Sequence, residues 1–273
     1  MLVIQIKGGL GNQMFQYAFG QVAKSKVVYD TSWFNTQTLR LYGLDFFNMN
    51  PKLISYDKLN NLRRGYSSFF HLRIKKHNLL FENPCNIFNP KLLDAKDVIL
   101  NGYFQCHQYY NSIRKQLLKE IVPLREINAV NQKYLDLIKK TNSISIHIRR
   151  TDYILLKDSF GFCGIEYYKK AIQHIISKVK NPHFFLFSDD IMWVKENFKL
   201  DFPYEIIDVN LGQDTPWDLW LMKHCKHNII ANSSFSWWGA WLNENPEKIV
   251  CAPQKWFADN RPIDIVPPNW IRF

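Results

Sequence analysis

The chain has 273 residues, 47% of them hydrophobic and 15% aromatic, which fills one large domain or two ordinary ones and excludes a disordered chain. No run of about 18 apolar residues occurs and no basic segment opens the chain, so we expect neither a membrane-spanning helix nor a signal peptide. The net charge of +11 favours polyanions, anionic membrane surfaces or phosphorylated ligands, without choosing among them.

The N-terminal segment predicts a strand, a glycine loop and a helix. Leu2–Ile6 is an apolar run typical of a buried strand, and apolar residues at helical spacing follow the loop. We expect Asn12 to cap this helix and a second strand to cover Lys26–Asp30. Glycines allow close backbone approach and helix N–H groups attract anions, so the loop is a candidate cradle for an anion or a sugar. Its candidate ligand-binding residues are Gly9, Gly11, Asn12 and Gln13.

The same loop imitates a dinucleotide-binding fingerprint, because Gly9 and Gly11 precede an acid at the end of the next strand. Met14, however, replaces the third glycine of that fingerprint. Amide side chains at Asn12 and Gln13 suit a hydroxyl-rich ligand better than a pyrophosphate. A nicotinamide or flavin site remains the alternative.

Residues 50–89 have a weaker pattern. Basic residues within 61–77 alternate with Tyr66, Phe69 and Phe70, which fits either a patch for an anionic membrane surface or a solvated helix face with core aromatics. Beyond it we predict a strand and two helices, the second serving as a domain connector. These elements cover Val98–Gln105, Ile113–Ile121 and Asn128–Lys140. The predicted domains are therefore residues 1–140 and 141–273.

The segment from Ser143 to Asp152 is the centre of the second half. Isoleucines alternate with polar residues, which is typical of a strand, and two arginines and an aspartate follow where a loop begins. Ligands bind at the carboxyl ends of strands in open α/β sheets. Paired arginines there favour a phosphate or pyrophosphate, although ion pairs with local carboxylates would also explain them. The candidates are His147, Arg149, Arg150 and Asp152.

The remaining sequence alternates strands with helices, which predicts parallel βαβ units of a nucleotide-binding type. The expected strands are His183–Phe187, Tyr204–Asp208, His227–Ala231 and Lys248–Ala252. The expected helices are Ile165–Val179, Ile191–Phe198, Pro216–Lys223 and Ser236–Asn243.

Two polar segments follow strands of this half. Ser188, Asp189 and Asp190 come after one strand, and an aspartate here suits a base or ribose, with a loop cap as the alternative. A run of hydroxyl and amide residues precedes a tryptophan-rich helix, whose N–H groups could seat a phosphate. Simple capping of that helix by Ser234 or Ser236 is equally compatible. The run is Asn232, Ser233, Ser234, Phe235 and Ser236.

Metal chemistry has little support in the sequence. No Asp-x-Asp occurs, so a manganese-dependent sugar-nucleotide enzyme is disfavoured, and we interpret the pair His224 and His227 as structural. The five cysteines are scattered and form no Cys-x-x-Cys, so we expect no metal site and no disulfide framework. A cytoplasmic location fits best, with peripheral contact at the inner membrane face as the most membrane association we expect.

Three long motifs together resemble the α-1,2-fucosyltransferase family, in its bacterial form. They lie at residues 8–18, 147–152 and 232–241, and shorter similar segments lie at 102–105 and 187–190. The resemblance implies a GT-B-like fold of two Rossmann-like domains facing across a cleft. It also implies an inverting, metal-independent transfer of fucose from GDP-fucose to the 2-hydroxyl of a galactoside. GDP-fucose is then a substrate, and no cofactor is expected.

The resemblance also implies roles for individual residues. Arg149 and Arg150 would hold the pyrophosphate, with residues 233–236 on its other side, and Asp189 would lie near the guanine or ribose. Asn12, with the loop glycines, would face fucose and acceptor.

Departure of GDP develops negative charge, and Arg150 is our first choice to stabilise it. For the general base, Asp152 and His147 are the candidates, or the transfer needs no strong base. Another GDP-sugar or linkage remains open, as does a non-catalytic protein binding nucleic acid or anionic lipid, although no nucleic-acid motif is present. The galactoside acceptor, lipid-linked or free, is not specified by the sequence.

Overall fold

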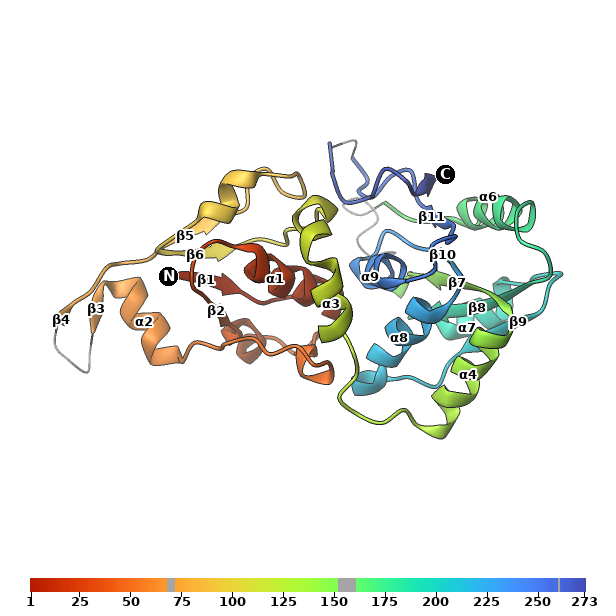
Figure 1. The fold of residues 1–273 in the computed structure, drawn as a ribbon, viewed down its shortest axis with the longest axis horizontal. Helices are drawn as coiled ribbons and strands as arrows, with labels where there is room; N and C mark the ends of the chain where they lie inside the picture. The colour runs from red at the N-terminus through yellow and green to blue at the C-terminus, as the bar shows by residue number, and fades with distance from the viewer. Residues whose placement is uncertain (68–71, 152–160, 260) are drawn as a thin grey trace. The chain divides into compact units, whose positions relative to one another are not determined.

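The computed structural model describes residues 1–67, 72–151, 161–259 and 261–273, and the chain forms two compact units (Figure 1). The N-terminal unit contains Met1–Leu124 and Pro262–Val266, and the C-terminal unit contains Arg125–Arg261 and Pro267–Phe273. The boundary thus falls before the helix that we expected to close the first domain. That helix packs on the C-terminal unit, so it belongs there rather than to a domain ending at residue 140.

The N-terminal unit is built on a parallel four-stranded sheet in the order β2-β1-β6-β5. Its strands are β1 (Leu2–Gln5), β2 (Val27–Asp30), β5 (Asn78–Phe81) and β6 (Val98–Asn101). Its helices are α1 (Leu10–Val22), α2 (Tyr56–Arg64) and α3 (Arg114–Glu120). A small antiparallel hairpin joins β3 (Tyr66–Ser67) to β4 (Leu72–Arg73). Short 3₁₀ turns cover Ser32–Thr36, Leu44–Phe46, Pro90–Asp94, His107–Tyr109 and Asn111–Ile113.

Apolar periodicity explains how helices cover this sheet. On one face, Leu59 and Leu62 of α2 pack on Val3, Val28 and Ile99 of the strands. The buried face of α1 carries aromatic rings, which pack against the segment that follows β6. The Phe19 ring stacks 4.1 Å from the ring of Phe104, for example. The sheet is therefore buried in its centre, as parallel sheets require.

The C-terminal unit contains a parallel six-stranded sheet in the order β12-β11-β10-β7-β8-β9. Its strands are β7 (Asn142–Ile148), β8 (Pro182–Ser188), β9 (Tyr204–Ile207), β10 (His227–Ile229), β11 (Val250–Ala252) and β12 (Ile271–Arg272). Its helices are α4 (Ala129–Lys140), α6 (Ile165–Ile176), α7 (Ile191–Asn197), α8 (Pro216–His224) and α9 (Ser234–Leu242). A 3₁₀ turn covers Gly212–Asp214.

Alternation along β7 places its isoleucines on one face of this sheet. They share a core with buried residues of α6 and α7, while buried residues of α4 and α8 pack on the opposite face (Figure 1). The sheet is thus enclosed by helices on both sides, as parallel sheets generally are. The predicted α/β class with two Rossmann-like, GT-B-like units is confirmed. The cleft expected between them stays a prediction.

Several element boundaries differ from those expected. The strand β6 ends at Asn101, and the helix α9 begins two residues before the expected Ser236. The strands β3, β4, β5 and β12 were not predicted: β5 is exposed along its whole length, and each of the other three has two residues, too few to show a period. Among the described residues, no helix is both long and apolar enough to cross a membrane.

Candidate active site

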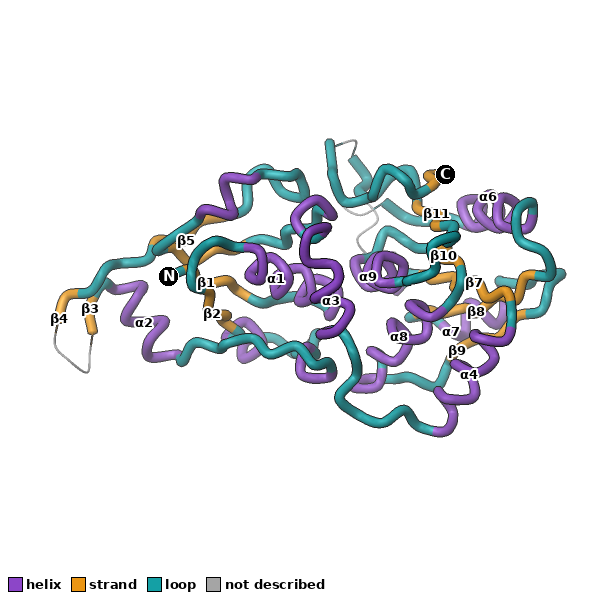
Figure 2. The backbone as a smooth tube through the Cα atoms, viewed as in Figure 1, coloured by secondary structure: helices purple, strands orange, loops and turns teal. Residues whose placement is uncertain are grey.

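Three polar segments meet at one edge of the C-terminal sheet. The strand β7 pairs in parallel with β8 on one side and with β10 on the other, so their carboxyl ends are neighbours (Figure 2). The segments at or just beyond these carboxyl ends are His147–Thr151, Ser188–Asp190 and Asn232–Ser236. A ring contact of 5.9 Å between His147 and Phe235 joins the first segment to the third. The strand order therefore brings together three motifs that are far apart in the sequence.

Asp189 organises the loop that carries the two arginines. One of its oxygens accepts the backbone N–H of Arg150 at 2.9 Å, and the other accepts the N–H of Thr151 at 3.1 Å. The second oxygen also accepts the Thr151 hydroxyl and lies 3.3 Å from Nη1 of Arg149. Burial opposes the charge of Asp189, but the Arg149 guanidinium and these donors outweigh it and hold its pKa below the usual value. The carboxylate is thus ionised and fixes the loop.

Arg150 is held separately, by Asp190 and by aromatic rings. Its Nε lies 3.2 Å from Oδ2 of Asp190, whose other oxygen caps α7 by accepting the N–H of Trp193. The guanidinium carbon lies 3.6 Å from the centre of the Trp193 ring and 5.8 Å from that of Phe162. Asp190, Arg150 and Trp193 therefore form a closed set of contacts. Trp193 was not predicted, although Asp190 directly before the expected helix is a readable N-cap that places residue 193 in the first turn.

The two arginines thus do form ion pairs with local carboxylates, which was the alternative to phosphate binding. Both carboxylates accept backbone N–H groups as well, so each also shapes the loop. The ion pairs hold the guanidinium groups at the carboxyl edge of the sheet, and planar guanidinium groups there suit phosphate oxygens. Asp189 acts on the loop in this structure, and its contact with a base or ribose stays a prediction.

His147 is buried at the end of β7, with 5% of its surface exposed. Its Nδ1 has no hydrogen-bond partner among the described residues. Burial, followed by the charge of Arg149, lowers the pKa of His147 to about 4 despite the nearby Asp189. The imidazole is therefore neutral near pH 7 and offers a ligand a hydrogen bond rather than a positive charge.

The serine-rich segment begins α9. Ser233 caps the helix by accepting the N–H of Phe235 at 3.3 Å, so the cap is neither Ser234 nor Ser236 as expected. Ser236 is buried and its hydroxyl donates to the Ser233 carbonyl at 3.4 Å. Ser234 and Phe235 are half-buried, which leaves them as the surface of this helix start.

Asn232 is turned into the protein. Its amide nitrogen donates to the carbonyls of Gly161 and Trp256, and its oxygen lies 3.4 Å from the sulfur of Cys163. With 1% of its surface exposed, it fixes the segment before α9 rather than presenting a group to a ligand. Ser188 likewise supports the neighbouring loop, since its hydroxyl accepts the N–H of Asp190 at 3.0 Å.

The glycine loop of the N-terminal unit differs from the expectation in two ways. The helix α1 begins at Leu10 with Gly9 as its cap, so Asn12 lies inside the first turn. Gln13 is fully buried, where it donates to the carbonyls of Gly8 and Leu41, so it is not at the mouth of the loop. The predicted positions of Asn12 and Gln13 were wrong because α1 begins before the first of the apolar residues that follow helical spacing.

Other residues of this loop remain candidates for a ligand. A Cβ at Gly9 would meet nothing within 4 Å, so there is open space above that residue. Gly8 has a φ of +79°, and a Cβ there would lie 2.8 Å from Nδ2 of Asn12. Asn12 is half-buried, and its oxygen accepts Nε2 of Gln105 at 2.7 Å. Its amide nitrogen can therefore still donate to a ligand. Gly11 is buried beneath this turn.

Sequence analysis missed two residues beside the glycine loop. Nζ of Lys7 donates to Asn101 at 2.6 Å and lies 4.8 Å from the centre of the Tyr103 ring, and burial lowers its pKa. Glu82 is buried and accepts the N–H groups of Tyr103 and Phe104 at 2.7 and 3.0 Å. Lys7 directly follows β1, so its position at a strand end was the available signal. Glu82 lies in the segment without a clear pattern.

Asp152, a candidate base, lies outside the described residues, as do Phe69 and Phe70 of the basic aromatic segment. Among the described residues, no cluster of three or more His, Cys, Asp or Glu side chains could hold a metal ion.

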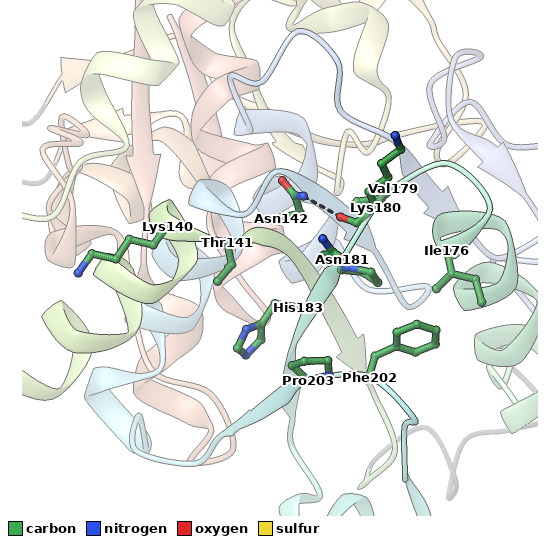
Figure 3. A pocket seen from close by; sticks show the side chains of 11 residues that line it. Lys140, Thr141, Asn142, Ile176, Val179, Lys180, Asn181, His183, Phe202 and Pro203 are labelled. Atoms are coloured by element: carbon green, nitrogen blue, oxygen red, sulfur yellow. Dashed lines mark hydrogen bonds between the residues drawn. The ribbon is translucent and has the colours of Figure 1, made fainter.

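A pocket lies at the opposite edge of the C-terminal sheet, where β7 and β8 begin (Figure 3). Asn142, Lys180 and His183 are among its lining residues, and the Asn142 amide donates to the Lys180 carbonyl at 2.7 Å. None of the predicted motifs contributes a lining residue. Since ligands of parallel sheets bind at the carboxyl ends, we do not include this pocket in the candidate site.

The geometry at the carboxyl edge of the C-terminal sheet can bind an anion with several oxygens. Two guanidinium groups supply charge and paired donors, and the start of α9 supplies N–H groups with the positive end of a helix dipole. The neutral His147 supplies a further hydrogen bond. Such an arrangement can also stabilise charge that develops on a phosphate leaving group.

Comparisons with known proteins agree with this reading. The glycosyl transferase family 11 model matches residues 1–273. An Escherichia coli O-antigen biosynthesis glycosyltransferase, WbnK, is 33% identical, covering 97% of this chain and 98% of that protein. An Escherichia coli alpha-1,2-colitosyltransferase is also 33% identical, covering 100% and 98%.

More distant relatives have related names. The galactoside alpha-(1,2)-fucosyltransferase 2 of Hylobates lar is 23% identical and covers 89% of this chain and 69% of its own. Among solved structures, the fucosyltransferase NodZ from Bradyrhizobium aligns with a TM-score of 0.48 and 13% identity, covering 87% of this chain and 92% of that chain. From the match over its whole length, the chain belongs to glycosyl transferase family 11 and is a glycosyltransferase.

Proposed function

We propose that the protein transfers fucose from GDP-fucose to the 2-hydroxyl of a terminal galactoside, with inversion and without a metal ion. The observation that carries this proposal is the meeting of Arg149, Arg150 and the start of α9 at neighbouring strand ends. The names of two relatives, an α-1,2-colitosyltransferase and an α-1,2-fucosyltransferase, support the linkage. The name of a third supports a surface polysaccharide as the product.

In this proposal the cationic groups stabilise the departing GDP. Cleavage of the bond between fucose and the β-phosphate leaves both bonding electrons on a phosphate oxygen, so negative charge grows there. Arg150 is placed to bind that oxygen because Asp190 and Trp193 fix its guanidinium before the ligand arrives. A preorganised group costs no reorganisation during the reaction, which makes its electrostatic effect large.

The acceptor hydroxyl attacks the sugar from the side opposite the phosphate and loses its proton. A neutral His147 with a pKa of about 4 is a weak base near pH 7, which favours hydrogen bonding to the donor over proton abstraction. Asp152 remains the proposed base, or the proton leaves to water late in an oxocarbenium-like reaction. Asn12 and Lys7 of the N-terminal unit are the proposed contacts for sugar hydroxyls.

The relative that transfers colitose motivates a second donor. Colitose is fucose without its 3-hydroxyl, so the two donors differ by one polar group. A site that hydrogen-bonds this hydroxyl rejects the deoxy sugar strongly, whereas a site without such a donor accepts both. We propose fucose as the primary sugar and colitose as the alternative.

The decisive experiment measures GDP release in the presence of EDTA, with lactose as the acceptor. GDP-fucose, GDP-colitose and GDP-mannose are compared as donors, for the wild type and for Arg150→Ala. We expect acceptor-dependent release from GDP-fucose that persists in EDTA. Loss of one leaving-group contact should cost about 100-fold or more in kcat. Arg125→Ala is the control, because Arg125 of the same unit forms an exposed ion pair with Asp214.

Each alternative has its own result. Turnover with GDP-colitose alone would replace fucose as the donor, and turnover abolished by EDTA would refute the metal-independent mechanism. If lactose is not used but GDP raises the melting temperature of the wild type, the donor site stands and the acceptor is a different galactoside. If GDP neither binds nor is released, the proposed donor site is wrong.

A further inference from the structure

One stretch of the N-terminal unit carries an unusual share of the positive charge. Residues 61–81 contain five Lys and Arg and no Asp or Glu, in a chain whose formal net charge is +11. This stretch runs from the end of α2 through the β3–β4 hairpin to β5. Its basic residues are Arg63, Arg64, Arg73, Lys75 and Lys76.

The strand β5 leaves two large apolar side chains uncovered beside α2. In the parallel register, Leu79 is paired with Ile99 of β6, and Phe81 is paired with Asn101. Paired residues of neighbouring strands point to the same face of a sheet, and α2 packs on Ile99. Leu79 and Phe81 therefore lie on the face covered by α2 but beyond its edge. They are 55% and 60% exposed.

Backbone hydrogen bonds link the segment that carries Lys75 and Lys76 to the end of α2. The N–H of His77 donates to the Leu62 carbonyl near the end of α2 at 2.9 Å. The N–H of Ile74 donates to the Gly65 carbonyl, which follows α2, at 3.1 Å. The basic end of α2 is thus tied to the segment that leads into β5.

Some of this charge is neutralised within the protein and some is not. Arg63 lies 3.6 Å from Asp30, and Lys75 lies 2.6 Å from Asp97. Three other basic side chains are exposed and form no ion pair with any residue that the structure describes. These are Arg64, Arg73 and Lys76.

Single exposed apolar residues are ordinary, but here the same stretch of chain also carries three exposed cations that form no ion pair with the described residues. Apolar side chains that insert at the acyl boundary, flanked by cations that attract anionic headgroups, are the chemistry of interfacial membrane binding. We propose that Leu79, Phe81, Arg64, Arg73 and Lys76, named here the β5 face, dock on an anionic phospholipid bilayer. A second copy of the chain carries the same positive charge, so charge complementarity favours the bilayer over self-association.

The test is cosedimentation of the full-length protein with vesicles of phosphatidylcholine, with and without one third phosphatidylglycerol. We expect binding to the anionic vesicles that weakens as salt rises, and little binding to the neutral ones. Each cation near a bilayer strengthens binding by about 1 kcal/mol, so Arg64→Gln, Arg73→Gln and Lys76→Gln together should weaken it roughly 100-fold. A second variant, Leu79→Ser with Phe81→Ser, should weaken it independently, even at low salt.

Matched controls separate the β5 face from net charge and general exposure. The exposed lysines of the C-terminal unit supply a triple change of equal charge, Lys133→Gln, Lys170→Gln and Lys178→Gln. Leu124→Ser with Leu211→Ser matches the apolar change, since these side chains are 64% and 75% exposed. Both controls should bind like the wild type, and all variants should keep its melting temperature and its turnover of a soluble acceptor.

Three results would overturn the proposal. The first is a wild type that does not bind anionic vesicles, and the second is a lysine control that loses as much binding as the β5 variant. The third is a dimer in sedimentation velocity that Leu79→Ser with Phe81→Ser dissolves while vesicle binding stays intact. None of these measurements depends on the donor sugar, so failure here is distinguishable from failure of the proposed transferase activity.

Discussion

The two units share one hydrogen-bonding arrangement but use it for different purposes. In each, a carboxylate from one strand end accepts backbone N–H groups of a loop that follows the neighbouring strand. Glu82 holds Tyr103 and Phe104 in this way, and Asp189 holds Arg150 and Thr151. The difference is that Asp189 also lies in an ion pair with Arg149, whereas the glycine loop is lined by amides and one lysine of lowered pKa. One loop is thus built for charge and the other for hydrogen bonding.

This difference indicates which loop would bind a phosphorylated ligand and which would bind a hydroxyl-rich one. Preorganised guanidinium groups suit phosphate oxygens, because charge-assisted hydrogen bonds are about twice as strong as neutral ones. Amides and an open glycine backbone suit hydroxyl groups.

Asp189→Asn should have the largest effect. An asparagine presents one acceptor oxygen, so it cannot serve both Arg150 and Thr151, and it leaves Arg149 without its ion pair. We expect kcat/KM for GDP release to fall by about 100-fold or more. Asp208→Asn is the control, since Asp208 pairs with Lys195 on the surface of the same unit. Near-normal turnover of Asp189→Asn would show that the carboxylate does not organise the donor site.

The buried imidazole should make stability depend on pH. Its pKa in the folded protein is about 4, below the unfolded value of about 6.5, so the unfolded chain binds more protons between these values. The contribution of His147 to the free energy of unfolding is therefore complete above about pH 6.5. It falls by up to about 3 kcal/mol as the pH drops to about 4.

Urea unfolding of the wild type and of His147→Gln at several pH values measures this effect. The stability advantage of the wild type should shrink from about pH 6.5 to 4. His224→Gln provides a comparison at a half-buried imidazole of the same unit. A difference that stays constant with pH would mean that His147 is not buried as a neutral ring.

Glu82→Gln tests the carboxylate that holds the loop of the N-terminal unit. The N–H groups of Tyr103 and Phe104 donate to one carboxylate oxygen and that of Asn86 donates to the other, so a single amide oxygen cannot accept from both sides and at least one buried N–H group loses its charge-assisted bond. We expect a loss of about 1–3 kcal/mol in the free energy of unfolding. The KM for the acceptor should rise while the KM for the donor stays unchanged. A rise in the donor KM instead would reverse the assignment of the two loops.

Trp193→Leu should have the smallest effect, because it removes the ring beneath Arg150 and leaves the ion pair with Asp190. A partly buried cation–π contact is worth about 0.5–2 kcal/mol, so the donor KM should rise roughly 3- to 30-fold. Trp193→Phe should recover most of the loss. Equal behaviour of the leucine and phenylalanine variants would contradict a role in positioning the guanidinium.

The sequence predicted most of the C-terminal unit because its signals are local. The alternation in β7 and the strand–helix repeat predicted the parallel sheet, and the position of Arg150 at a strand end marked the candidate site. The N-terminal unit was less predictable. The strand β5 has four residues, all exposed, so no burial pattern marked it. Gln13 was misplaced because its partners, the carbonyls of Gly8 and Leu41, are set by the turn and by a distant segment.

By itself, the sequence determined the α/β class, the order of the main elements and the residue types at each strand end. These follow from periodicity and from short motifs, which act over a few residues. The tertiary structure alone determined which of those residues are turned into the core and which stay at the edge of the sheet. Strand order placed β8 and β10 on either side of β7, and burial then turned Asn232 and Gln13 inward while Trp193 came to lie over Arg150. The reason is that residues that pair or pack together lie tens of residues apart in the sequence. A pattern that spans only a few residues cannot predict such contacts.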